Sequence, residues 1–179
     1  MILITTSHRS SQRTRSFVKD LASTIPFALR VIRGKKTLQE LITQTYLLKY
    51  KWLLIVEEKN GNPSRLKFYH ADLGASRPEG REVGWATIRG VRLSRENPSA
   101  VKTSQASTIS VDYEGCVGNE CFSLADLLLM VFSRAVSSNP DIVLRLRENR
   151  GIEVRFYSRH NVETGPMFRV EKVVINERV

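Results

Sequence analysis

Acidic side chains are scarce in the first third of this chain. Residues 1–51 contain ten lysines and arginines but only two acids, Asp20 and Glu40, whereas the later residues carry nearly balanced charge. The net charge of +10 is therefore concentrated near the N-terminus. A polyanion is the simplest partner for such a surface, because solubility alone does not require this segregation.

The sequence lacks the patterns that mark membrane-spanning and secreted proteins. No apolar run approaches the roughly 18 residues that a membrane span needs, which predicts no membrane partner. The first residues, MILITTSHRSS, lack the basic segment followed by an apolar stretch that marks a signal peptide. We therefore expect a cytoplasmic protein.

The residues that bind metals or carry out nucleophilic catalysis are few and scattered. Cys116 and Cys121 are too few for a disulfide framework, and we interpret them as two small residues near a turn, with a redox or metal role as the alternative. His8, His70 and His160 do not have metal-ligand spacing, and no GxSxG or kinase signature is present. We expect no cofactor, no metal and no enzymatic activity.

The first seventy residues alternate between strand and helix patterns. Apolar runs and helix-capping signals predict these elements: strand 2–5, helix 11–25, strand 28–32, helix 37–50, strand 51–58 and strand 65–70. Ser10 or Ser11 is the expected cap of the first helix, and Thr37 with Glu40 forms a capping box for the second. This alternation favours helices packed on a sheet.

The later residues mix the same element types, with fewer helices. Residues 71–84 are polar and contain glycine and proline, which predicts a connector. Ser123 is a candidate cap of a later helix. The elements expected beyond the connector are strands 86–93 and 107–113, helix 122–136, and strands 142–148, 152–158 and 168–176. Turns are expected at 148–151 and 160–166. We predict a mixed α/β (α+β) fold in one domain, 1–179, with similar halves at 1–72 and 83–179.

The stretch TTSHRSSQR, between the first strand and the first helix, has the composition of an anion site. Backbone N–H groups at a helix N-terminus lack partners, and serine hydroxyls and forked guanidiniums bind phosphate oxygens. Arg15 and Lys19 are four residues apart, so they share a helix face. The alternative is an ordinary solvated helix N-terminus with capping serines.

Two further segments carry basic residues close to a turn. Arg33, Lys35 and Lys36 precede the second helix, but Leu29 stands where a phosphate-binding P-loop requires glycine, so we reject that motif. In the strand after the Asn-Gly turn, Arg65, Lys67 and Tyr69 share one face, and an exposed Tyr69 would stack on an unpaired base. An edge strand with a polar outer face is the alternative.

Three of these stretches together resemble a known family. ILITTSHRSSQRTRSFVKDLA resembles the opening signature of the Brix domain in its short archaeal form, and RGKKTLQEL and GNPSRLKFY resemble its basic turn and its hairpin. The resemblance implies a ribosome biogenesis factor that binds ribosomal RNA or its precursor, with ribosome-assembly proteins as further candidate partners. It also implies two α/β halves, each a sheet with packed helices resembling the anticodon-binding domain of class II aminoacyl-tRNA synthetases.

The charge pattern and the resemblance together give a set of expected RNA contacts. The set comprises Ser7, Arg9, Ser11, Gln12, Arg13, Thr14, Arg15, Lys19, Arg33, Lys35, Lys36, Arg65, Lys67 and Tyr69. Three other functions remain open: a tRNA-binding module, a small enzyme that acts on a phosphorylated substrate with His8 as base near Arg13, and an adaptor for acidic protein tails.

Overall fold

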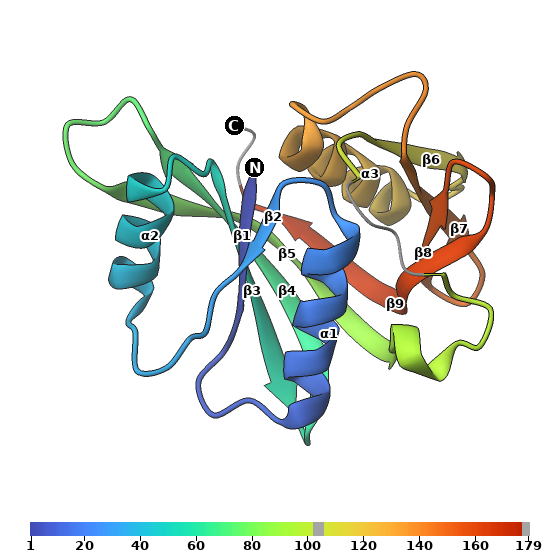
Figure 1. The fold of residues 1–179 in the computed structure, drawn as a ribbon, viewed down its shortest axis with the longest axis horizontal. Coiled ribbons are helices and arrows are strands. Elements are labelled where there is room, and N and C mark those ends of the chain that lie inside the picture. The colour runs from blue at the N-terminus through green and yellow to red at the C-terminus, as the bar shows by residue number, and fades with distance from the viewer. Residues whose placement is uncertain (102–105, 177–179) are drawn as a thin grey trace.

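The computed structural model describes residues 1–101 and 106–176, and their strands join into one nine-stranded sheet (Figure 1). The elements in chain order are β1 (Ile2–Thr6), α1 (Gln12–Thr24), β2 (Ala28–Arg30), α2 (Leu38–Leu47), β3 (Trp52–Lys59), β4 (Asn62–Asp72), β5 (Glu79–Arg92), the 3-10 helix η1 (Ser94–Glu96), β6 (Ile109–Gly115), α3 (Asn119–Phe132), β7 (Ile142–Glu148), β8 (Ile152–Ser158) and β9 (Glu163–Ile175).

The sheet is built from two halves with the same strand pattern. Its order is β2-β1-β3-β4-β5-β9-β8-β7-β6. β1 is parallel to β3, and β3, β4 and β5 are antiparallel neighbours; β6 is likewise parallel to β7, and β7, β8 and β9 are antiparallel. The halves meet at the antiparallel pair β5 and β9. The predicted mixed α/β fold class is confirmed, with β2 and α2 as additions to the N-terminal half.

The helices cover the two faces of the sheet unequally. α1 and α3 pack on one face, where Phe17 of α1 meets Phe168 of β9 edge-on with ring centroids 5.6 Å apart. α2 packs on the other face, over β3 and β4, where Leu41, Leu53 and Tyr69 share a smaller core. Figure 1 shows strands standing between α2 and α1. Within the described residues, the α2 side of the sheet has no helix over β7 and β8.

Several predicted elements are confirmed, and several predicted boundaries are wrong. Strands 142–148 and 152–158, the Ser11 cap and the Thr37–Glu40 capping box are all present. Residues 71–84 are not a connector throughout, because β5 begins at Glu79. Gly84 lies at a close strand approach, where a Cβ would come within 2.5 Å of the Val174 carbonyl oxygen.

Two of these errors concern the residues at which α3 and β9 begin. α3 begins at Asn119 rather than after Ser123, because Glu148 accepts hydrogen bonds from the backbone N–H groups of Val117 (2.8 Å) and Gly118 (2.7 Å). β9 begins at Glu163, inside the predicted turn 160–166, because pairing with β8 extends the strand. Contacts with residues distant in the sequence therefore determine where both elements begin.

The two cysteines form a disulfide that the sequence did not predict. Cys116 follows β6 and Cys121 lies in the first turn of α3, with their Cα atoms 5.4 Å apart. Both side chains are buried, and they pack in the core beneath α3. The bond joins the strand to the helix of the C-terminal half, so the interpretation as two unpaired small residues is wrong.

Candidate nucleic-acid interface

The N-terminus of α1 is already occupied by a carboxylate of the same chain. Ser11 caps the helix by accepting from the Thr14 N–H (3.2 Å), and its own N–H donates to Glu58 Oε2 (2.7 Å). Burial raises the pKa of Glu58, but hydrogen bonds from Thr14 and Ser11 outweigh it and hold that pKa below its usual range. The predicted phosphate contact at the start of this helix stays a prediction, and a phosphate on the Ser11 amide would have to displace Glu58.

Glu58 has a counterpart in the C-terminal half. Glu148 at the end of β7 accepts from the amides that precede α3, as Glu58 near the end of β3 accepts from the amide that precedes α1. β7 and β3 hold equivalent places in the two halves. Each half thus neutralises the positive end of its own helix, and cationic side chains must supply any anion site.

A hollow of about 220 Å³ lies beside α1 and brings both basic junctions together. Its walls are the end of β1, the first turns of α1 and the segment from β2 to Gly34, and the arginines that line it are Arg9, Arg15, Arg30 and Arg33. We call it the arginine hollow. Within the described ranges, none of the four has a carboxylate at ion-pair distance.

Backbone and side-chain contacts fix the shape of the arginine hollow. The Val31 N–H donates to the Ile4 carbonyl (2.9 Å), and Thr5 Oγ1 donates back to the Val31 carbonyl (3.0 Å), so β1 holds the segment after β2. Arg33 donates to His8 Nε2 (3.1 Å), which places the ring hydrogen on Nδ1, facing the Gly34 carbonyl (3.3 Å). The two loops that precede α1 and α2 are therefore tied together.

Arg33 is the most constrained cation of the arginine hollow. Burial lowers the pKa of its guanidinium, with the Tyr69 hydroxyl acting in the opposite direction. Its Nε is buried and has no hydrogen-bond partner among the described residues. An anion in the hollow would stabilise this desolvated charge, since burying a charge without a partner is costly.

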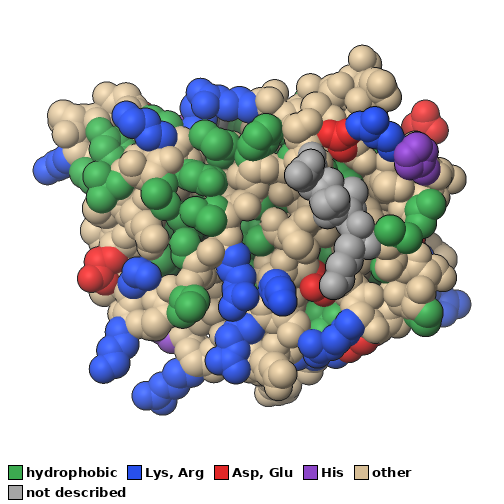
Figure 2. Space-filling model, in the orientation of Figure 1, with side chains coloured by type: hydrophobic (Ala, Val, Ile, Leu, Met, Phe, Trp, Pro, Cys, Tyr) green, Lys and Arg blue, Asp and Glu red, His purple; other side chains and the backbone are tan. Residues whose placement is uncertain are grey.

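The surface around the arginine hollow is rich in cations. Figure 2 shows Lys and Arg side chains gathered below the middle of one face, where Asp and Glu side chains are few. Ser7 also lines the hollow, and Lys35 is exposed on the same loop as Arg33 and Gly34. Lys36 donates to the Ile32 carbonyl (3.2 Å), which anchors that loop.

Four of the expected RNA contacts lie elsewhere on α1. Arg13 points away from the arginine hollow and pairs with Glu96, while a second N–H donates to the Val91 carbonyl (2.8 Å). Thr14 is wholly buried, so its expected RNA contact is wrong. Gln12 is exposed at the start of the helix, and Lys19 lies one turn beyond Arg15.

The hairpin residues share a face as predicted, but one of them is covered. Arg65 and Lys67 both lie near Glu57, at 3.6 and 3.0 Å. Tyr69 is only 8% exposed because α2 packs over it, and its hydroxyl donates to Glu82 (2.9 Å). The prediction that Tyr69 stacks on a base is therefore wrong.

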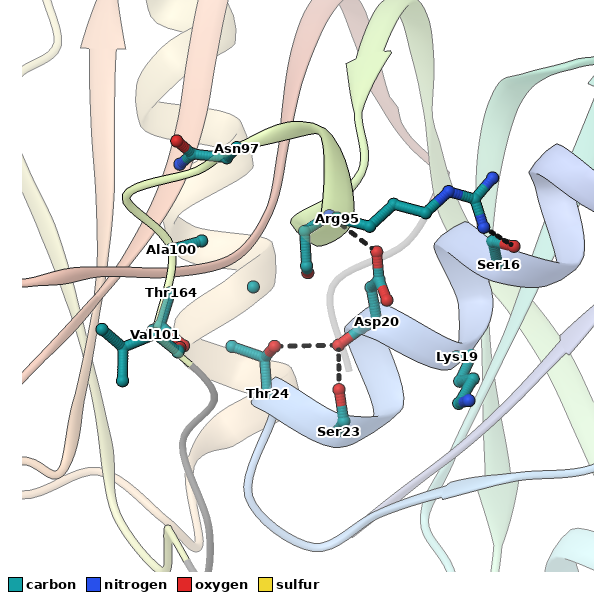
Figure 3. A pocket seen from close by; sticks show the side chains of 12 residues that line it. Ser16, Lys19, Asp20, Ser23, Thr24, Arg95, Asn97, Ala100, Val101 and Thr164 are labelled. Carbon is teal, nitrogen blue, oxygen red and sulfur yellow. Dashed lines mark hydrogen bonds between the residues drawn. The ribbon is translucent and has the colours of Figure 1, made fainter.

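A larger hollow of about 610 Å³ lies between α1, η1 and the start of β9 (Figure 3). Asp20 accepts the Ser94 N–H there (2.8 Å), and Arg95 donates to Ser16 (3.1 Å), so two of its charged groups are engaged. Lys19 also lines this hollow. His8 and Arg13, which the enzyme alternative would place together, lie apart. Among the described residues, no group of histidine, cysteine and acidic side chains could hold a metal ion.

Two features of the site escaped the sequence prediction. Arg30 was counted only as part of the basic excess, although parallel pairing with β1 brings it into the arginine hollow. Glu58 was not identified as a site residue, and the pairing of β3 with β1 brings it beside Ser11.

Comparison with known proteins identifies relatives across most of the chain. No family model matches. A protein of Thermococcus kodakarensis named "probable Brix domain-containing ribosomal biogenesis protein" is 42% identical over 97 residues, which cover 54% of this chain and 44% of that protein. One of Methanopyrus kandleri with the same name is 32% identical over 150 residues, covering 84% of this chain and 66% of that protein.

A solved structure extends the likeness to the whole fold. The crystal structure of a probable ribosomal biogenesis protein from Aeropyrum pernix K1 superposes with a TM-score of 0.82 at 27% identity, covering 99% of this chain and 98% of that one. The chain belongs to the family of Brix domain-containing ribosomal biogenesis proteins. Its matched region spans less than half of the Thermococcus relative. No helix among the described residues is long and apolar enough to cross a membrane.

Proposed function

We propose that this protein acts in ribosome biogenesis by binding ribosomal RNA or its precursor through the arginine hollow and the loops around it. The names of its relatives support the process, since they are called ribosomal biogenesis proteins. The observation that carries the RNA contact is the cluster of Arg9, Arg15, Arg30 and Arg33, which lie around one hollow without carboxylate partners in the described part of the chain.

The chemistry of the arginine hollow fits the backbone of RNA. Guanidinium groups donate in a fixed fork that matches phosphate oxygens, and Ser7 adds a hydroxyl to the same wall. Several such contacts along one surface bind a polyanion by charge and by release of counterions. This function requires no bond chemistry, and RNA shape together with 2′-hydroxyl contacts would favour RNA over DNA.

The test is binding to ribosomal RNA fragments, tRNA and duplex DNA of similar length across a salt series. We expect the tightest binding to ribosomal RNA, with affinity falling steeply as salt rises. A preference for tRNA would instead support the tRNA-binding alternative. Equal and weak binding to all three would contradict the proposal, and acidic protein tails would then be the partner to test.

A further inference from the structure

The side of the sheet away from α1 and α3 carries charged and aromatic side chains where α2 does not cover it. On β7 and β8, buried apolar residues alternate with polar ones that face this side. We call this surface the open face. The side chains on it that form ion pairs or ring contacts are Glu57, Arg65, Lys67, Trp85, Arg92, Asp112, Arg145, Arg147, Glu153, Arg155, Tyr157, Glu163, Arg169 and Lys172.

Four carboxylates of the open face are each shared between two cations. Glu57 lies near Arg65 and Lys67, and Asp112 lies near Arg145 and Arg147. Glu153 and Glu163 are shared in the same way among the arginines of β5, β8 and β9. Cations therefore outnumber acids, and the face keeps a net positive charge while its guanidiniums are held in place.

Two of these arginines lie on aromatic rings. The Arg65 guanidinium carbon is 4.6 Å from the centroid of the Trp85 ring, and the Lys172 ammonium is 5.8 Å from it. The guanidinium carbon of Arg145 is 4.3 Å from the centroid of the Tyr157 ring, and its Nε donates to Asp112 (2.8 Å). Each pair presents a flat, cationic platform that is organised before any partner arrives.

The two platforms lie at opposite ends of β9. Trp85 pairs with Val174 near the end of that strand, and Tyr157 pairs with Glu163 at its start. At about 3.3 Å per residue, roughly 35 Å of strand separates them. Arg169 lies between them on β9, so at least one further guanidinium stands along the span that separates the platforms.

We propose that the open face binds single-stranded RNA, with unpaired bases stacked on the Arg65–Trp85 and Arg145–Tyr157 platforms. Bases stack on guanidinium planes and aromatic rings whatever their sequence. An acidic peptide fits less well, because the paired cations of this face are already engaged with internal carboxylates, whereas flat surfaces suit bases. This inference rests on the proposed function and extends it from the RNA backbone to the bases.

The protein contains its own probe for this contact. Its two tryptophans are Trp52, which is buried, and Trp85 on the open face, so Trp52→Phe leaves Trp85 as the only tryptophan fluorophore. The variant is titrated with an oligoribonucleotide of about 12 nucleotides, within the range that single-strand-binding sheets occupy. An abasic oligomer of equal length and charge is the control. We expect the first to quench Trp85 fluorescence and the second to leave it nearly unchanged.

A matched pair of tyrosine variants measures the second platform. Tyr157→Ala is expected to weaken binding of the oligoribonucleotide roughly 5- to 100-fold, the range for the loss of one stacked base. Tyr113→Ala removes an exposed tyrosine of β6 that has no such platform, and we expect no change. Because the fluorescence comparison uses unaltered Trp85, it stands even if Tyr157→Ala does not fold.

The outcomes separate this inference from the proposed function. If ribosomal RNA binding depends on Arg15 and Arg30 but bases never quench Trp85, the open-face inference fails while the proposed function stands. If base-dependent quenching occurs but replacing Arg15 and Arg30 leaves the affinity for ribosomal RNA unchanged, the open face is supported and the arginine hollow is not. Equal effects of the abasic oligomer, or displacement of RNA by polyglutamate with the same quenching, would contradict base stacking.

Discussion

Replacing Arg15 and Arg30 together by alanine tests whether the arginine hollow holds RNA phosphates. Both side chains are exposed and line the hollow, and neither has a carboxylate at ion-pair distance within the described ranges, so their removal does not break the core. If all four arginines of the hollow each neutralise one phosphate, they contribute about −3 to −3.5 to the slope of log K against log salt. Losing two should make the slope shallower by about 1.5 to 2.

The same change should weaken binding at moderate salt by roughly 30-fold, which corresponds to about 1 kcal/mol for each guanidinium–phosphate contact. The matched control is Arg13→Ala/Arg77→Ala, which removes the same charge from arginines that already pair with Glu96 and Glu79. The assay is filter binding of a ribosomal RNA fragment at several salt concentrations. Equal slopes for the two double variants would refute the assignment of phosphates to the hollow.

Three further predictions concern stability. Glu58→Gln should lower the free energy of unfolding at pH 7 by about 0.5 kcal/mol. Because hydrogen bonds hold the pKa of Glu58 below its usual value, this difference should fade as the pH falls through that lowered pKa, which urea unfolding at pH 7 and at increasingly acidic pH would show. Reduction of the Cys116–Cys121 disulfide should cost about 2 kcal/mol, measured by urea unfolding with and without reductant, and no shift would contradict it. Phe17→Ala should cost about 3–5 kcal/mol in the same assay, since the ring is wholly buried against Phe168.

Local pattern was sufficient for much of the fold. Strands β7 and β8 match their predicted bounds, because strict alternation and the Asn149-Arg150-Gly151 turn define a hairpin from neighbouring residues alone. The capping box of α2 could also be predicted, because Thr37 and Glu40 are only three residues apart. Elements whose stabilising contacts lie within a few residues can be predicted from one sequence.

The missed features depend on contacts between distant residues. Tyr69 has the pattern of an exposed strand residue, and only the packing of α2 on β4 covers it. Glu58 reaches Ser11 across 47 positions of sequence, and Arg13 finds Glu96 across 83. The same holds for the site. The two basic loops could be predicted from local composition, but which of their cations share a hollow depends on the pairing of β1 with β2.

The most direct test of the central claim is photo-cross-linking to a ribosomal RNA fragment that contains 4-thiouridine, followed by identification of the attached peptides. The account predicts cross-links in the segments 7–15 and 30–36, competed by unlabelled ribosomal RNA and weakened by Arg15→Ala/Arg30→Ala. Cross-links confined to the α3 surface, or equally strong competition by tRNA and ribosomal RNA, would contradict it.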